Sequence, residues 1–174
     1  MLAMPAALWA HMEYTMKYPD DIDFFYFLEN HGWSTCLIFV EGKVYEMGPT
    51  HIFENPIEVL LNSMIELLEG ADESEFLWHD EPGEYKWSIR RNQEQKHKVL
   101  VSVTECTQVN TFETPKMETL KFEVKLKLFS ICILRQMEKI RDLMSEKSFK
   151  EHRDGQFPYN TFKEYKLAHE RTYS

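Results

Sequence analysis

The chain has 174 residues, of which 43% are hydrophobic, 14% aromatic and 28% charged. This balance is typical of a folded globular protein and argues against an intrinsically disordered chain. The formal net charge of −9 repels nucleic-acid phosphates, so we expect no nucleic-acid partner. No apolar run is long enough to cross a bilayer, so we expect no membrane partner either.

Residues 1–20 start with an apolar segment that lacks the basic leading region of a signal peptide, and Pro5 and Glu13 interrupt it. We therefore interpret residues 1–20 as a loosely attached extension and residues 21–174 as a single domain. The three cysteines form no Cys-x-x-Cys pair, which indicates free thiols in a reducing compartment and predicts a cytoplasmic location.

The domain is expected to begin with three strands. Residues 22–28 and 33–40 are runs of aromatic and branched side chains, which predict two buried strands with a turn between them. Glu41 and Gly42 predict a tight turn into a third strand at residues 43–47.

A helix is predicted next, from Pro56 to a stop at Gly70. Asn55 is suited to cap its first turn, and Glu58 stands at the spacing of a capping box. Apolar residues recur between them and Gly70 at helical intervals, so one face of this helix should lie on a sheet.

The second half predicts four more strands and two helical segments. Residues 76–80 and 84–91 should form a hairpin around Pro82 and Gly83, a pair that predicts a type II turn. Residues 98–105 and the alternating residues 120–128 predict two further strands.

Apolar residues then recur every helical turn from residue 129, and residues 161–169 predict a last helix. The fold expected is α+β: a mostly antiparallel sheet of about seven strands, with an inserted amphipathic helix and a C-terminal helical segment on one face.

A cluster of two aromatic and three acidic residues surrounds the predicted hairpin turn: Trp78, Asp80, Glu81, Glu84 and Trp87. Charged hairpin tips are common, and carboxylates beside a histidine also have the chemistry to bind a divalent cation or to exchange protons. Aromatic anchors within an acidic rim suit a protein partner, because rings supply contact energy and charges steer association. We take this cluster as the candidate partner-binding site and expect no metal and no catalytic residue in it.

Motifs of other functional classes are missing from the sequence. It has no Gly-x-Gly-x-x-Gly, Walker-type or Gly-x-Ser-x-Gly motif, and its histidines and cysteines lack the spacing of a zinc site. We therefore expect no cofactor.

Residues 78–87, together with the predicted strands and helices after them, resemble a pattern in small uncharacterised bacterial proteins. In these, an aromatic residue, an acidic pair, Pro-Gly-Glu and a second aromatic strand precede an apolar strand and a C-terminal helix. Arg153, with Phe157 and Pro158 after it, is similar to their ending. Some of these proteins resemble members of toxin–immunity neighbourhoods. The resemblance therefore implies an inhibitor or accessory binder, and it carries over no catalytic residue.

These observations are compatible with three functional hypotheses. The leading one is a non-enzymatic, immunity-like or accessory protein. It would bind another protein of basic character and act by occluding it. The second is a small-molecule binder or enzyme with a pocket between helix and sheet, lined by a further set of residues: Phe24, Tyr26, Trp33, Tyr45 and His51. The third is a homodimer whose interface accounts for the abundant aromatic residues.

Overall fold

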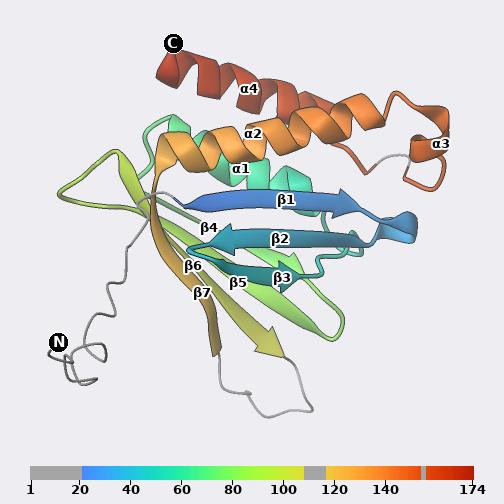
Figure 1. The fold of residues 1–174 in the computed structure, drawn as a ribbon, viewed down its shortest axis with the longest axis horizontal. Helices are drawn as coiled ribbons and strands as arrows, with labels where there is room; N and C mark the ends of the chain where they lie inside the picture. The colour runs from blue at the N-terminus through green and yellow to red at the C-terminus, as the bar shows by residue number, and fades with distance from the viewer. Residues whose placement is uncertain (1–20, 108–116, 154–155) are drawn as a thin grey trace, which may run out of the picture.

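The computed structural model describes residues 21–107, 117–153 and 156–174 (Figure 1). The extension expected at residues 1–20 lies outside the described residues. The strands are β1 (Ile22–Leu28), β2 (Ser34–Val40), β3 (Lys43–Met47), β4 (Glu73–His79), β5 (Gly83–Arg91), β6 (Lys98–Thr107) and β7 (Met117–Lys125). The helices are α1 (Pro56–Leu68), α2 (Leu126–Leu143), α3 (Lys147–Lys150) and α4 (Tyr159–Tyr173), and a 3-10 turn, η2 (Asn30–Gly32), joins β1 to β2.

The strands form two antiparallel sheets, one of three strands in the order β1-β2-β3 and one of four in the order β4-β5-β6-β7. The α+β class and the antiparallel pairing are therefore confirmed, whereas the single sheet divides in two. The division falls where α1 carries the chain from β3 to β4. Figure 1 shows α1, α2 and α4 gathered on one side of the strands.

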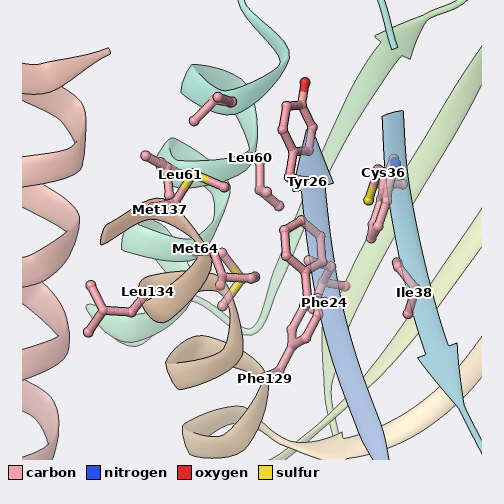
Figure 2. Packing of buried hydrophobic residues seen from close by; sticks show 14 of the residues in the cluster. Phe24, Tyr26, Cys36, Ile38, Leu60, Leu61, Met64, Phe129, Leu134 and Met137 are labelled. Atoms are coloured by element: carbon pink, nitrogen blue, oxygen red, sulfur yellow. The ribbon is translucent and has the colours of Figure 1, made fainter. Parts of the chain in front are cut away.

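The hydrophobic core lies between the two sheets and beneath the helices. Every second residue of β1 from Phe24 onward is buried: Phe24, Tyr26 and Leu28. The Tyr26 ring meets the Trp78 ring edge-on, with centroids 5.9 Å apart, and so joins the two sheets. Figure 2 shows Phe24 and Tyr26 surrounded by side chains of α1 and α2 such as Met64 and Met137. The side chains of both sheets and both helices thus fill one continuous core.

Helix α1 agrees with its prediction because its signals are local. The Asn55 side chain accepts hydrogen bonds from the backbone N–H groups of Ile57 (3.0 Å) and Glu58 (3.3 Å). These bonds satisfy N–H groups that have no partner within the helix. Gly70 comes after the helix with a φ of 109°, a left-handed conformation that glycine adopts without a steric cost.

The boundary between β7 and α2 differs from the prediction. The alternating pattern indicates a strand to residue 128, but the strand ends at Lys125 and the helix starts at Leu126. Leu126 is buried and continues the alternation of Phe122 and Val124, but it also stands one helical turn before the buried Phe129, so the pattern alone does not locate the change. The backbone N–H of Leu126 donates to the His97 carbonyl (2.9 Å), which ties the start of α2 to the loop before β6.

The two tight turns have different outcomes. The turn at Glu41 and Gly42 is confirmed, with φ values of 48° and 80° that suit a two-residue hairpin. The type II turn predicted from Pro82 and Gly83 is wrong. The Glu81–Pro82 peptide bond is cis and Gly83 has no positive φ, so the chain reverses with Pro82 at the third position of the turn.

Within the part of the chain that the structure describes, no helix has the length and apolar composition needed to cross a bilayer.

Candidate functional site

The β4–β5 hairpin presents its turn at one end of the four-stranded sheet. The backbone N–H of Asp80 donates to the Gly83 carbonyl (2.9 Å) and closes the turn. The Tyr85 hydroxyl donates to Asp80 Oδ2 (3.2 Å). Burial, then the nearby Asp80 and Glu105 carboxylates, raises the pKa of Tyr85 to about 12, so this hydroxyl keeps its proton and remains a donor. Asp80 is thereby held in place, while Glu81 is exposed to solvent.

The two tryptophans of the predicted site lie in the core. Trp78 and Trp87 are both fully buried, and their rings pack edge-on with centroids 4.8 Å apart. Trp78 also donates its indole N–H to the Pro56 carbonyl (2.8 Å), so it fastens the start of α1 to the sheet. Neither ring is accessible to a partner in this conformation. Their assignment as anchors is corrected, because the face of the hairpin that carries them meets the other sheet.

The loop at residues 48–55, between β3 and α1, lies beside this hairpin. The backbone N–H of Thr50 donates to the His79 carbonyl (2.8 Å), and the N–H of His51 donates to the Gly32 carbonyl (2.8 Å). Thr50 also forms an isolated antiparallel bridge with Trp33. Three segments distant in the sequence are therefore joined by backbone hydrogen bonds at the same end of the molecule.

Exposed apolar side chains gather on these joined segments. Phe53 is 72% exposed, Ile52 52% and Trp33 40%, and the Phe53 ring packs edge-on against His79 at 4.8 Å. His79 is the last residue of β4, directly before the acidic turn. We call this region the tip surface and define it by five residues: Trp33, Ile52, Phe53, Asp80 and Glu81.

Two carboxylates at the turn end of the hairpin, Glu81 and Glu84, differ from Glu75, which lies farther along the outer face of the same hairpin. On that face, Glu75 lies 2.9 Å from Lys86 and also pairs with Arg90. By contrast, Glu81 and Glu84 form no ion pair with another described residue. Their charge is left to act on solvent and on whatever approaches this end of the sheet.

Sequence reasoning missed Ile52 and Phe53. They stand in a loop, where no strand or helix period distinguishes an exposed apolar residue from a buried one. The available signal was their position: two large apolar residues between Gly48-Pro49 and the cap Asn55, outside both neighbouring elements. Large apolar side chains in such a segment must either pack on the body of the protein or remain exposed.

The structure does not bring the five residues of the alternative pocket into one hollow. Phe24 and Tyr26 are 1% exposed and fill the core. Trp33 belongs to the tip surface, and Tyr45 lines a cleft of about 720 Å³ between β3 and the strands β6 and β7. That set of lining residues is therefore corrected, because alternation along β1 turns two of its members into the packed interior.

His51 is the remaining member of that set. Burial lowers the pKa of His51, which favours its neutral imidazole. Its Nε2 has no hydrogen-bond partner among the described residues. The described residues contain no group of three or more side chains suited to holding a metal ion. At this end of the molecule, exposed apolar side chains lie beside carboxylates, an arrangement that suits a contact surface.

Comparison of the chain with protein-family models, with curated proteins and with solved structures found no match.

Proposed function

We propose that this protein is a non-enzymatic binding protein that uses the tip surface to cover, and so occlude, part of a partner protein. The observation that carries the proposal is the position of Phe53, which is 72% exposed and packed edge-on against His79, the residue that leads into the acidic turn. Aromatic side chains are enriched at the centres of protein interfaces, where a few buried anchors supply most of the binding energy.

The carboxylates favour a basic partner. Asp80 and Glu81 lie on the turn beside Phe53, and the chain as a whole carries a net charge of −9. Such a surface attracts a positively charged partner and raises the rate of encounter. The partner would then bury the apolar side chains of Ile52 and Phe53, whose removal from water stabilises the complex.

The segments of the tip surface are also held before binding. Backbone hydrogen bonds join the loop at residues 48–55 to Gly32 and to His79, and the Asp80–Gly83 bond closes the turn. A surface that is already ordered loses less conformational entropy when it binds than a disordered segment does.

The test is capture of the partner by the tagged protein from a lysate of its native source, read by mass spectrometry. The site variant replaces Asp80, Glu81 and Glu84 by Ala. A matched control replaces three exposed carboxylates of the helical region by Ala and so makes the same change in charge: Glu146, Glu151 and Glu164.

The proposal predicts a stoichiometric partner that the control variant retains and the site variant loses. Capture of a partner by both variants to an equal extent would assign binding to another surface. The lysate should come from cells that express this protein. If only the tagged protein itself is then recovered, the proposal of a stable protein partner is contradicted.

The homodimer is the second candidate, and a different surface favours it. On the outer face of the three-stranded sheet, Phe25 and Phe27 of β1 are 38% and 43% exposed, and Val44 of β3 is 63% exposed. A second copy placed on this face would bury those side chains. A molar mass measured by light scattering that stays at one chain across concentration would remove the homodimer.

We also propose a cytoplasmic location. Cys36, Cys106 and Cys132 are free thiols, and burial raises the pKa of Cys36 well above its ordinary value. Free thiols persist in a reducing compartment. Fractionation of the source, with the protein found outside the soluble intracellular fraction, would contradict this location.

A further inference from the structure

At the end of the molecule opposite the tip surface, the helices and the four-stranded sheet line a largely apolar cavity of about 600 Å³ that is open to solvent on one side. Its walls come from the last turns of α1 and α4, the first turn of α2, and the loop between β5 and β6. In Figure 1 the C-terminus of α4 and the start of α2 mark this end, on the left of the view. The apolar lining includes Leu67, Leu68, Leu126 and the ring of Tyr173. The volume lies in the range of small-molecule sites.

The rim of this cavity is positively charged, in a chain whose net charge is −9. Four cations line it with a single carboxylate, that of Asp72: the cations are Arg91, Lys96, Lys125 and Lys127. Lys96 pairs with Asp72 at 3.3 Å.

Two of the cations have no carboxylate partner among the described residues. Arg91 donates only to backbone carbonyls, among them those of Ala71 (3.3 Å) and Lys96 (2.8 Å). Lys127 lies over the Tyr173 ring, 5.4 Å from its centroid. Two positive charges at the edge of an apolar hollow are complementary to a ligand with one anionic group.

The helix ends at the cavity differ in sign, because α1 and α4 end there and α2 begins there. The carbonyls at the end of α1 carry partial negative charge, but Leu67 and Ala71 accept hydrogen bonds from Arg91. The Leu68 carbonyl accepts one from the Thr172 hydroxyl (3.2 Å). The start of α2, at Leu126, adds the positive end of a helix of 18 residues.

We propose that this cavity binds a small anionic amphiphile, a single-chain carboxylate whose apolar chain lies on Leu67, Leu68 and Leu126 and whose carboxylate lies between Arg91 and Lys127. This site is separate from the tip surface, so it goes beyond the proposed protein binding and does not depend on it.

The test is a calorimetric titration of the full chain with decanoate below its micelle concentration. Decanol and decyltrimethylammonium serve as neutral and cationic probes with the same chain. Lys127→Glu reverses a rim charge, and Lys163→Glu makes the same change at an exposed position of α4 outside the cavity. Thr172→Trp fills the cavity without changing charge. Far-UV circular dichroism checks that each variant is folded.

We expect decanoate to bind at one site per chain, and each of the other two probes to bind about tenfold more weakly or worse. Lys127→Glu should weaken decanoate binding by about tenfold, whereas Lys163→Glu should leave it unchanged. Thr172→Trp should abolish it.

Absence of decanoate binding to the unsubstituted chain would overturn the proposal. So would equal affinity of Lys127→Glu and Lys163→Glu for decanoate, since Arg91 and Lys127 are the charges that define the site. If Thr172→Trp does not fold, the two lysine variants still decide the outcome.

Discussion

The body of the β4–β5 hairpin and the tip surface hold similar aromatic side chains in opposite surroundings. In the body, Trp78 and Trp87 are fully buried and pack against each other. At the tip, the Phe53 ring packs on His79 but remains 72% exposed. The difference teaches that aromatic content alone does not reveal a binding surface. The second sheet decides which rings become core, and the loops decide which rings stay in contact with solvent.

Among the substitutions considered, replacement of Trp78 by Ala should cause the largest loss of stability. The change removes a fully buried side chain that joins both sheets and the start of α1, so we expect it to lower the free energy of unfolding by about 3–5 kcal/mol. Chemical denaturation monitored by circular dichroism measures the loss. A loss below about 1 kcal/mol would contradict the position of Trp78 in the core.

Phe substitutions at the two tryptophans should separate their hydrogen bonds from their packing. Trp78→Phe removes the hydrogen bond from the indole N–H to the Pro56 carbonyl, whereas the Trp87 indole N–H has no partner among the described residues. We therefore expect Trp78→Phe to lower the free energy of unfolding by about 1–2 kcal/mol more than Trp87→Phe does. Denaturation curves of the two variants, recorded under the same conditions, measure this difference. The reverse order would contradict the Trp78–Pro56 hydrogen bond.

A buried histidine, His169, should make the free energy of unfolding depend on pH. His169 Nδ1 is hydrogen-bonded to the Ser130 hydroxyl at 2.7 Å, and burial, then Lys127 and Arg135, lowers the pKa of His169 below its ordinary value of 6.5. The unfolded chain therefore takes up a proton there before the folded chain does, and stability falls as pH decreases through about 6.5.

The measurement is the free energy of unfolding between pH 7.5 and 5.5 for the unsubstituted chain and for His169→Gln. We expect a smaller pH slope in the variant. The slope should not vanish, because burial also lowers the pKa of His51, with the same sign. Identical slopes in the two proteins would contradict this role for His169.

Changes at the tip should have the smallest effect on stability. Phe53→Ala and Glu81→Ala remove exposed side chains, and we expect each to alter the free energy of unfolding by no more than about 0.5 kcal/mol. Thermal melts of Phe53→Ala and Glu81→Ala, compared with the melt of Trp78→Ala, test this expectation. A large loss from Phe53→Ala would indicate that this ring supports the fold, and the contrast between body and tip would then disappear.

The parts of the fold that were predicted correctly depend on neighbouring residues. Asn55, Pro56 and Gly70 mark α1 because a helix end needs a cap and a stop within a few positions. Glu41 and Gly42 mark the β2–β3 turn for the same kind of reason.

What could not be predicted depends on residues far apart in the chain. Trp78 is buried because Tyr26 of the other sheet packs on it, and no local pattern states that the sheet divides there. The candidate site changed for the same reason. Trp33, Phe53 and Asp80 lie in three different segments, which long-range backbone hydrogen bonds and a bridge bring together. The acidic residues of the site form one cluster in the sequence, whereas its exposed aromatic residues stand in separate segments.

The most direct test of the central claim is the affinity of the captured partner, once purified, for Phe53→Ala compared with Val44→Ala. Both variants remove a highly exposed apolar side chain, but Val44 lies on β3 in the outer face of the other sheet. Binding through the tip surface predicts that Phe53→Ala weakens the complex by about 30-fold or more, while Val44→Ala leaves the dissociation constant unchanged. Equal affinity of the two variants would contradict partner binding at the tip surface.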